Sequence, residues 1–385
     1  MTTVVDTPFA PDTTRRIRVL HIVPLPPPQG GMATFAVGML GSVLGDAFDL
    51  IPLRADRVNK LKHRGIVRKV LNLVNLMLLS WAMLWRIVWY RPKIVHIQSN
   101  SGGGFLANAH LAFQARLLGR KVLMSIHGGG FRDFYDRAGR LNRHHIRTGL
   151  RVPHRIICAT PRMWDTLSQI GVPEERLALI GNGINPAERT RTEVTPDGEP
   201  LRVLFLNRVT VPKGVCELID AAVRLHEAFP QMRVRIAGFP SDDQPALEAH
   251  MNECGAGEYV HFVGGIETDA KEQEYLDADI YALPSHVEDL PYGMLEAMGY
   301  GLPCVVSDVG GLSTLTEQGA SGLLVPPQDV DALVEALGRL LGDATLRQQL
   351  GRAARERIVT EYSWDHRGGQ IVELYRDVLD QSPVS

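Results

Sequence analysis

Short apolar runs rich in β-branched residues recur along the first half of the chain, and longer helical stretches separate them. Nearly continuous apolar strands of this kind are typical of a parallel sheet that is covered on both faces. We therefore expect the first half to form a doubly wound α/β unit. The expected strands are residues 17–23, 93–98, 121–126, 155–159 and 177–180.

The same alternation restarts after a polar segment near the middle of the chain. Residues 186–200 hold three prolines and show no apolar period, which predicts a linker. Beyond it, apolar runs at 201–207, 232–237, 259–263, 280–283 and 304–307 predict a second α/β unit. We expect a first domain over residues 1–190 and a second over 200–362. A helical tail within 363–385 is expected to cross back to the first domain.

Residues 60–91 differ from the rest of the first half. They begin with six basic residues, Lys60, Lys62, His63, Arg64, Arg68 and Lys69. Residues 70–85 then carry no charge, but this stretch is shorter than the roughly 20 residues of a spanning helix. One hypothesis is a helix in the membrane interface, with Trp81, Trp85 and Trp89 along it. The alternative is a long helix packed on the sheet. The two interpretations are compatible if one face of the helix packs on the sheet and the other contacts the membrane.

The composition, with 45% hydrophobic and 22% charged residues, is that of an ordinary soluble protein, and 385 residues suffice for two cores. The four cysteines, Cys158, Cys216, Cys254 and Cys304, form no CxxC pair. This spacing favours a reducing compartment and argues against a structural zinc. Residues 1–14 lack the basic-then-apolar pattern of a signal peptide. We therefore expect a cytoplasmic protein.

The small net charge of −2 hides a strong asymmetry between the two halves. Residues 1–190 hold 26 lysines and arginines against 11 acidic residues, whereas residues 191–385 hold 15 against 32. A basic first half suggests contact with something anionic, such as a membrane surface, a lipid phosphate or nucleic acid. The alternative is that the opposite charges help the two domains attract each other.

The most informative stretch is residues 284–311, PSHVEDLPYGMLEAMGYGLPCVVSDVGG. A strand ends before it, Glu288 lies in the following loop, and a helix is expected to start near Tyr292, which places Glu296 one turn into that helix. The first amide groups of a helix attract phosphate because they are unpaired and lie at its positive end. Carboxylates at the same edge can accept hydrogen bonds from sugar hydroxyls.

Two cations and several glycines are expected at the same edges of the sheets. Arg208 ends a strand, and Lys213 opens the next helix five residues later, so both can neutralise a diphosphate. In the first domain, Gly30 and Gly31 follow the first strand, where glycine permits close approach of a ligand. His127 ends the strand at 121–126 and precedes three glycines, so we expect it at the carboxyl edge of the first sheet.

These blocks resemble the retaining GT-B glycosyltransferases of family 4. Residues 288–311 are similar to the family's E-x7-E block and its continuation, and residues 204–222 to its "GR…KG" block. The resemblance implies that Glu288 contacts the transferred sugar and Glu296 the nucleotide ribose. It assigns the diphosphate to Arg208 and Lys213.

The family resemblance extends to the glycine turns and to the loop between the two acids. It places Gly30 and Gly31 against the donor phosphates, His127 near the sugar and Gly264 near the nucleobase. The loop departs from the family's usual E-G-F-G, because it reads Glu288-Asp289-Leu290-Pro291. Pro291 has no N–H, so an amide contact is lost. Leu290, Pro291 and Tyr292 nonetheless occupy the donor-binding positions.

The resemblance implies two Rossmann-like domains that face a cleft, and a metal-independent, hexosyltransferase-type enzyme that uses a nucleoside-diphosphate sugar and no further cofactor. Together with the basic first half, it suggests a lipid-linked acceptor in cell-surface polysaccharide synthesis, with the protein peripheral at the inner face of the membrane. The alternatives are a sugar phosphorylase or soluble disaccharide-type synthase, or a non-catalytic partner that binds nucleotide-sugar or membrane. No nucleic-acid motif accompanies the basic half.

Overall fold

The chain forms two separate six-stranded sheets in which every strand pairs in parallel with its neighbours. The computed structural model describes residues 16–26, 31–55, 65–190, 195, 199–266 and 268–381. The first sheet has the order β2-β1-β3-β4-β5-β6 and the second β12-β11-β10-β7-β8-β9. The strands of the first sheet are β1 (Arg18–Val23), β2 (Asp49–Arg54), β3 (Ile94–Asn100), β4 (Lys121–His127), β5 (Arg155–Cys158) and β6 (Leu177–Leu179). Those of the second are β7 (Arg202–Leu206), β8 (Arg233–Ala237), β9 (Val260–Gly264), β10 (Ile280–Leu283), β11 (Cys304–Ser307) and β12 (Leu323–Val325).

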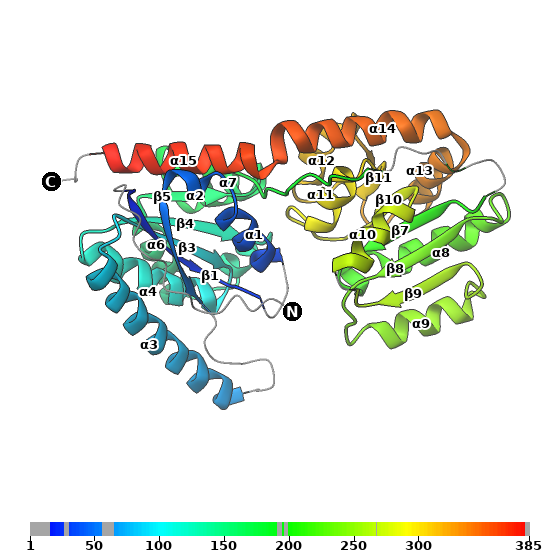
Figure 1. Cartoon of the computed structure of the whole chain (residues 1–385). Coiled ribbons are helices and arrows are strands. Elements are labelled where there is room, and N and C mark those ends of the chain that lie inside the picture. The colour runs from blue at the N-terminus through cyan, green and yellow to red at the C-terminus, as the bar shows by residue number, and fades with distance from the viewer. Residues whose placement is uncertain are drawn as a thin grey trace.

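Helices cover both faces of the first sheet, as Figure 1 shows. One face packs against α3 (Gly65–Tyr90), α4 (Gly103–Leu117), α6 (Arg140–Arg151) and α7 (Pro161–Ile170). The other packs against α1 (Gly31–Leu40), α2 (Leu44–Ala47) and the C-terminal helix α15 (Trp364–Asp380). Because side chains alternate along a strand, Leu20 and Ile22 enter the first layer and Val19 and Val23 the second.

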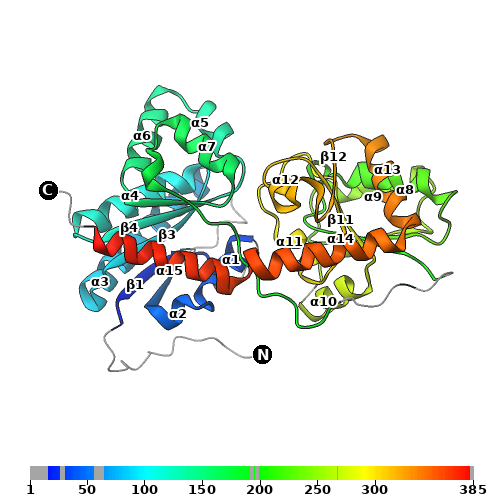
Figure 2. The ribbon, with the colours of Figure 1, turned by 90° about the horizontal axis from the view of Figure 1, so that it is seen from above.

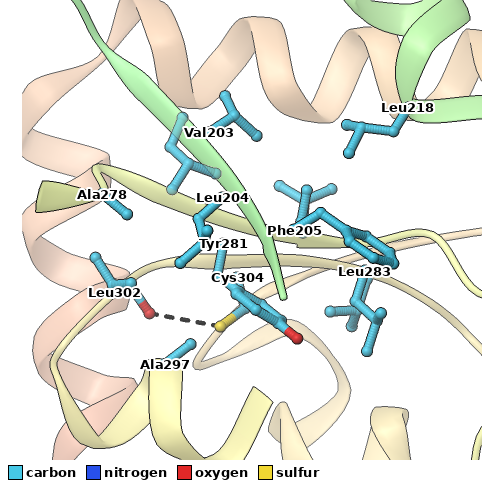
Figure 3. Packing of buried hydrophobic residues seen from close by; sticks show 14 of the residues in the cluster. Val203, Leu204, Phe205, Leu218, Ala278, Tyr281, Leu283, Ala297, Leu302 and Cys304 are labelled. Atoms are coloured by element: carbon cyan, nitrogen blue, oxygen red, sulfur yellow. Dashed lines mark hydrogen bonds between the residues drawn. The ribbon is translucent and has the colours of Figure 1, made fainter. Parts of the chain in front are cut away.

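The second domain is built in the same way around a larger core. Its helices are α8 (Val215–His226), α9 (Gln244–Glu253), α10 (Thr268–Asp277), α11 (Tyr292–Gly299), α12 (Leu312–Leu315), α13 (Val330–Gly342) and α14 (Ala344–Arg357). In Figure 3, Phe205 of β7, Leu283 of β10 and Leu218 of α8 lie in one buried cluster. All four residues of β10 are buried, so the loop that follows this strand starts from a rigid position.

Two segments connect the domains, and they are hydrogen-bonded to each other. The backbone N–H of Ile184 donates to the carbonyl of Tyr362 at 2.9 Å, and the N–H of Trp364 donates to the carbonyl of Ile184 at 2.9 Å. From above, α14 and α15 follow each other across the molecule, so that α15 returns to the first domain (Figure 2). Trp364 is 3% exposed there and packs where Gly38 and Gly183 leave room for its indole.

The predicted fold class, two doubly wound parallel α/β units, is confirmed. Each of the ten expected strands overlaps an observed one, but β2 and β12 were not predicted. Both are edge strands, and β2 contains Pro52, which is tolerated only where a strand needs no partner on one side. The expected linker at 186–200 lies between β6 and β7, and just before it Asn182 and Ile184 contact the second domain or the returning segment.

The α3 helix is longer than the uncharged stretch suggested. It runs for 26 residues, and Val67–Tyr90 is long and apolar enough to cross a membrane by length and composition. Its inner face is buried in the first domain through Leu79, Ala82, Met83 and Ile87. The expectation that this segment packs on the sheet is therefore met for one face of the helix.

Burial keeps one histidine of the first sheet neutral. His21 lies in the middle of β1, is fully buried between the sheet and α15, and burial lowers its pKa from 6.5 to about 3. Below pH 6.5 the unfolded chain binds a proton that the folded chain does not, so acid favours unfolding until the pH reaches the folded pKa. At pH 5 this difference in proton binding lowers the free energy of unfolding by about 2 kcal/mol.

We expect the free energy of unfolding to fall as the pH decreases from 7 to 4, and His21→Leu to reduce the slope by roughly one proton. Chemical denaturation at several pH values measures this slope. The matched control is His144→Leu, which removes an exposed histidine of α6 and is expected to leave the slope as it is in the wild type. An unchanged slope in His21→Leu would contradict the lowered pKa of His21.

Candidate active site

Glu288 lies in the loop after β10, where three donors converge on one of its carboxylate oxygens. The Lys213 ammonium lies 2.5 Å from Oε1, and the Asn207 amide and the Ser285 hydroxyl donate to the same oxygen at 3.2 Å each. Glu288 is 8% exposed, so its charge is held in a largely desolvated place. Charge-assisted bonds of this kind fix a side chain in one orientation. Glu288 and Lys213, predicted from separate blocks, are thus brought together.

Two glycines allow the backbone to approach closely enough for this arrangement. Gly214 precedes α8 with φ of 78°, and a side chain there would collide with the carbonyl of Pro284. Gly310 has φ of 62°, and a side chain there would collide with the carbonyl of Glu288. Both angles lie in the left-handed region that only glycine adopts without cost. The loop that carries Glu288 is therefore held from two sides.

Glu296 has a separate environment with its own lysine. Its carboxylate lies 2.6 Å from the Lys271 ammonium and accepts a hydrogen bond from the Tyr275 hydroxyl at 2.8 Å. Burial raises the pKa of Tyr275 well above its usual range, so the hydroxyl remains a donor. These three side chains line a pocket of about 190 Å³ together with Ile184, Asn185, Ala187, Glu272 and Tyr300. Sequence reasoning missed Lys271, because it belongs to no motif and comes close only through folding.

The two cations predicted to hold a diphosphate have different surroundings. Arg208 follows β7 and is exposed, and within the described part of the chain no ion pair occupies its guanidinium. Its backbone N–H donates to the side chain of Asn207 at 2.7 Å. Lys213 ends the short turn before α8, and no side chain caps the first amide groups of that helix. Arg208, Lys213 and the start of α8 thus offer positive charge at one edge of the second sheet.

The loop between the two acids is attached to the first domain. The Thr160 hydroxyl donates to the Asp289 carboxylate at 2.9 Å, and the backbone N–H of Gly128 also bonds to it. The Asn182 amide donates to the carbonyl of Leu290 at 2.8 Å. Burial raises the pKa of Asp289, although its two hydrogen bonds oppose that shift. Asp289 and Leu290 of this loop thus form contacts between the domains.

The remaining donor-binding predictions fall in different places. Leu290 and Pro291 are buried, so their side chains do not face a ligand space. Tyr292 is the first residue of α11, and a side chain at Gly31 would lie 3.6 Å from its ring, so helices of the two domains begin next to each other. Gly264 ends β9, two strands away from β7. Gly30 lies outside the described residues.

His127 ends β4 and directly precedes the glycines that meet the Glu288 loop. Its Nε2 donates to the side-chain oxygen of Gln98 at 2.6 Å, and its ring packs edge-on against Phe35 with 4.6 Å between centroids. Burial lowers the pKa of His127 from 6.5 to about 4, so the ring is neutral at pH 7. A neutral ring with a proton on Nε2 has an acceptor at Nδ1. The predicted histidine is therefore a neutral hydrogen-bonding group.

One group of possible metal ligands occurs among the described residues. Asp220 of α8, His250 of α9 and Cys254 have ligand atoms within 4.8 Å of one another. The cysteine spacing argued against a structural zinc, but His250 and Cys254 are four residues apart and so share a helix face. The Nε2 atom of His250 bonds to the Asp220 carboxylate at 2.7 Å. Two of the three possible ligands are therefore already paired with each other.

Two family models match adjoining parts of the chain. Residues 43–188 match the description "Glycosyltransferase Family 4", and residues 187–357 match "Glycosyl transferases group 1". A D-inositol 3-phosphate glycosyltransferase of Corynebacterium urealyticum is 37% identical over 180 residues, 45% of this chain and 42% of the relative. An uncharacterized glycosyltransferase of Methanocaldococcus jannaschii is 29% identical over 227 residues, 56% of this chain and 58% of the relative. The chain thus spans about half the length of the curated relatives that it matches.

Solved structures share the fold over nearly the whole chain. A sucrose-phosphate synthase from Thermosynechococcus elongatus superposes with a TM-score of 0.76 at 22% identity, covering 96% of this chain and 100% of that one. Anabaena HepE in complex with UDP-glucose gives a TM-score of 0.71 at 17% identity, covering 94% and 100%. At these identities the likeness concerns the GT-B fold alone.

We expect Gly310→Ala to lower the free energy of unfolding by about 2 kcal/mol or more, because it combines backbone strain with a collision at the Glu288 carbonyl. Gly369→Ala is the matched control: this glycine lies within α15, nothing lies within 4 Å of its added methyl group, and alanine favours a helix. Denaturant unfolding measures both. Equal stability of the two variants would show that the Glu288 loop is not held at Gly310.

Proposed function

We propose that this chain, which belongs to the family 4 glycosyltransferases, moves a sugar with retention from a nucleoside-diphosphate sugar to an acceptor hydroxyl. The observation that carries this proposal is the Glu288 cluster, in which a buried carboxylate and a lysine are fixed at the edge of the second sheet, next to the His127 turn of the first. A carboxylate, a cation and a neutral imidazole are the groups that a diphosphate-linked sugar requires.

The diphosphate is proposed to bind at Arg208, Lys213 and the first turn of α8. Leaving-group departure places negative charge on the diphosphate oxygen, and fixed cations stabilise that charge most in a site shielded from water. The bond between the anomeric carbon and this oxygen breaks with its electron pair on the diphosphate. The acceptor oxygen then bonds to the same carbon, and its proton passes to the departing diphosphate oxygen.

The sugar and the nucleoside are proposed to occupy the two acid environments. Glu288 lies beside Lys213 and accepts hydrogen bonds from sugar hydroxyls, while Nδ1 of neutral His127 accepts one more from the first domain. Glu296 lines the pocket of about 190 Å³ and accepts from ribose hydroxyls, with Lys271 and Tyr275 holding it in place. The contacts of Asp289 and Leu290 with the first domain support closure over the reacting atoms.

The acceptor is proposed to be a lipid-linked glycan at an anionic membrane surface, which agrees with a role in cell-surface polysaccharide synthesis. The support is the outer face of α3, where large apolar side chains are exposed: Val67, Val70, Leu73, Val74, Met77, Leu78, Trp81, Trp85, Val88 and Trp89. Spacings of three and four residues put them on one helical face. Trp85 and Trp89 stack with 5.8 Å between ring centroids. Contiguous exposed apolar faces of this kind mark interaction sites.

An interfacial position suits α3 better than a membrane span. A span would place the inner face in lipid, but this face is buried against the sheet and carries Asn75 and Ser80. Exposed Arg68 and Lys69 begin the helix, and tryptophan is enriched at the level of lipid headgroups. The helix lies on the opposite side of the first domain from α15 in Figure 1, so membrane contact leaves the returning helix in place.

A donor screen tests the proposed activity. We expect one of UDP-, GDP-, ADP- or dTDP-sugars to release nucleoside diphosphate in the presence of a membrane lipid extract, and Glu288→Gln and Lys213→Ala to lose at least about 100-fold in rate. The matched control Asp242→Asn changes an exposed acid in the same domain and is expected to keep the rate. Release that needs only a soluble sugar or phosphate would favour a synthase or phosphorylase, and neither release nor binding would favour a non-catalytic partner.

Vesicle sedimentation tests the membrane contact. We expect the wild-type chain to bind phosphatidylglycerol vesicles, and Val88→Asp to weaken binding about tenfold, because a carboxylate enters the apolar face of α3. Val359→Asp is the matched control, since this valine is also exposed but lies between α14 and α15. If the wild type ignores anionic vesicles, or if both variants bind alike, the membrane proposal fails.

A further inference from the structure

A row of polar side chains crosses the face of the first sheet that α1, α2 and α15 cover. Register places His21 of β1 beside His96 of β3, and Gln98 of β3 beside Ser125 of β4. His127 follows at the end of β4, on the same face as Ser125. Apart from His127 at the cleft, these residues are at most 2% exposed. The row therefore connects the interior beneath α15 with the candidate active site.

Hydrogen bonds link this row from α15 to the cleft. The Tyr375 hydroxyl of α15 lies 2.6 Å from Nδ1 of His96 and 3.4 Å from Nε2 of His21. The Gln98 amide nitrogen lies 3.4 Å from Nε2 of His96, and its oxygen lies 2.6 Å from Nε2 of His127. Tyr375 is itself fully buried. The C-terminal helix is thus three hydrogen bonds away from His127.

With neutral rings, this row donates in one direction when Nε2 of His96 is the acceptor. Burial lowers the pKa of each of the three histidines, so each ring has one donor and one acceptor. With its oxygen toward His127, the Gln98 amide donates to Nε2 of His96, which also lies 2.8 Å from the Ser125 hydroxyl. Nδ1–H of His96 then donates to Tyr375. The Tyr375 hydroxyl then donates to His21. A change at one end therefore alters which nitrogen carries the proton at the other.

A second contact joins the start of α15 to the same histidine. The Trp364 indole packs edge-on against Phe35 with 5.2 Å between centroids, and Phe35 packs against His127 with 4.6 Å. Phe35 is 2% exposed. The aromatic contact fixes the plane of the His127 ring, and the polar row fixes its hydrogen-bonding edge.

We propose that Tyr375 is a positioning residue for the transfer reaction, which acts through His96 and Gln98 to hold His127 with its proton on Nε2 and its acceptor toward the cleft. Its effect on rate rests on the proposed function, but its effect on the ring proton does not. The seating of the C-terminal helix thereby controls whether the first domain presents a sugar-binding acceptor.

Packing alone does not require this row. Polar groups in a core are costly unless all are paired, and Phe48, Ile371 and Val378 already supply apolar contacts under α15. A purely structural role predicts that loss of the Tyr375 hydroxyl lowers stability and leaves His127 unchanged. A positioning role predicts a change in the proton position at His127.

The test is Tyr375→Phe in the full chain, labelled with ¹⁵N-histidine and followed by long-range ¹H–¹⁵N spectra. The His127 signals are assigned by their loss in His127→Asn. We expect His127 to be the Nε2–H form in the wild type and to shift toward Nδ1–H in Tyr375→Phe. We also expect kcat to fall about tenfold with the donor KM unchanged.

Two further variants make the outcome decisive. Gln98→Met cuts the last link and is expected to give the same change at His127, with no further loss when it is combined with Tyr375→Phe. Tyr259→Phe, a buried tyrosine of the second domain stacked on His226, is the matched control and is expected to change neither quantity. An unchanged His127 in both row variants overturns the proposal, and so does a shifted proton with an unaltered kcat. If the wild type transfers no sugar, the proposed function fails, while the spectra still decide whether Tyr375 sets the His127 proton.

Discussion

The two chain crossings between the domains are paired by backbone hydrogen bonds at Ile184, and the geometry of the site depends on this pairing. Each domain folds around its own sheet, and in the described part of the chain no strand of one sheet pairs with a strand of the other. The bonds from Ile184 to Tyr362 and Trp364 join the outgoing and returning segments at one point. Such a paired connection restricts the relative motion of the domains more than one flexible linker does. The returning segment then continues directly into α15.

Contacts at the cleft use the alignment that this connection provides. Thr160 and Asn182 of the first domain bond to the backbone and side chains of the loop at Asp289 and Leu290, immediately after Glu288. The Asp289 carboxylate would be costly to bury without the donors Thr160 and Gly128, so the sequence of this loop and the contact between the domains depend on each other. The α15 contacts with Phe35 and His96 extend this dependence to His127.

The parts of the fold that were predictable from the sequence are those set by local patterns. Buried parallel strands produce continuous apolar runs, so ten strands and the parallel α/β class followed directly. The edge strands β2 and β12 did not, because one contains Pro52 and the other has three residues. The site divides similarly: Glu288 and Lys213 belong to recognisable blocks, whereas Lys271, Gln98 and Tyr375 come close only through tertiary packing. Two histidines within apolar strands were the available signal for the polar row, since neighbouring parallel strands can place such residues side by side.

The two faces of α3 show why a single segment supported two interpretations. Its inner face satisfies the ordinary requirement that a helix cover a sheet, and Asn75 on that face bonds to the carbonyl of Ala55 at 3.2 Å. That requirement leaves the outer face unconstrained, and solubility alone would favour charged residues there. Ten large apolar side chains occupy it instead, while Arg68 and Lys69 lie near the start of the helix and Arg86 lies near its end. Because water penalises apolar area by about 25 cal/mol for each Å², a partner that covers this face gains free energy of binding. An anionic membrane matches both the apolar face of α3 and the positive charge of the first half. The acidic second domain matches the positive charge but not the apolar face.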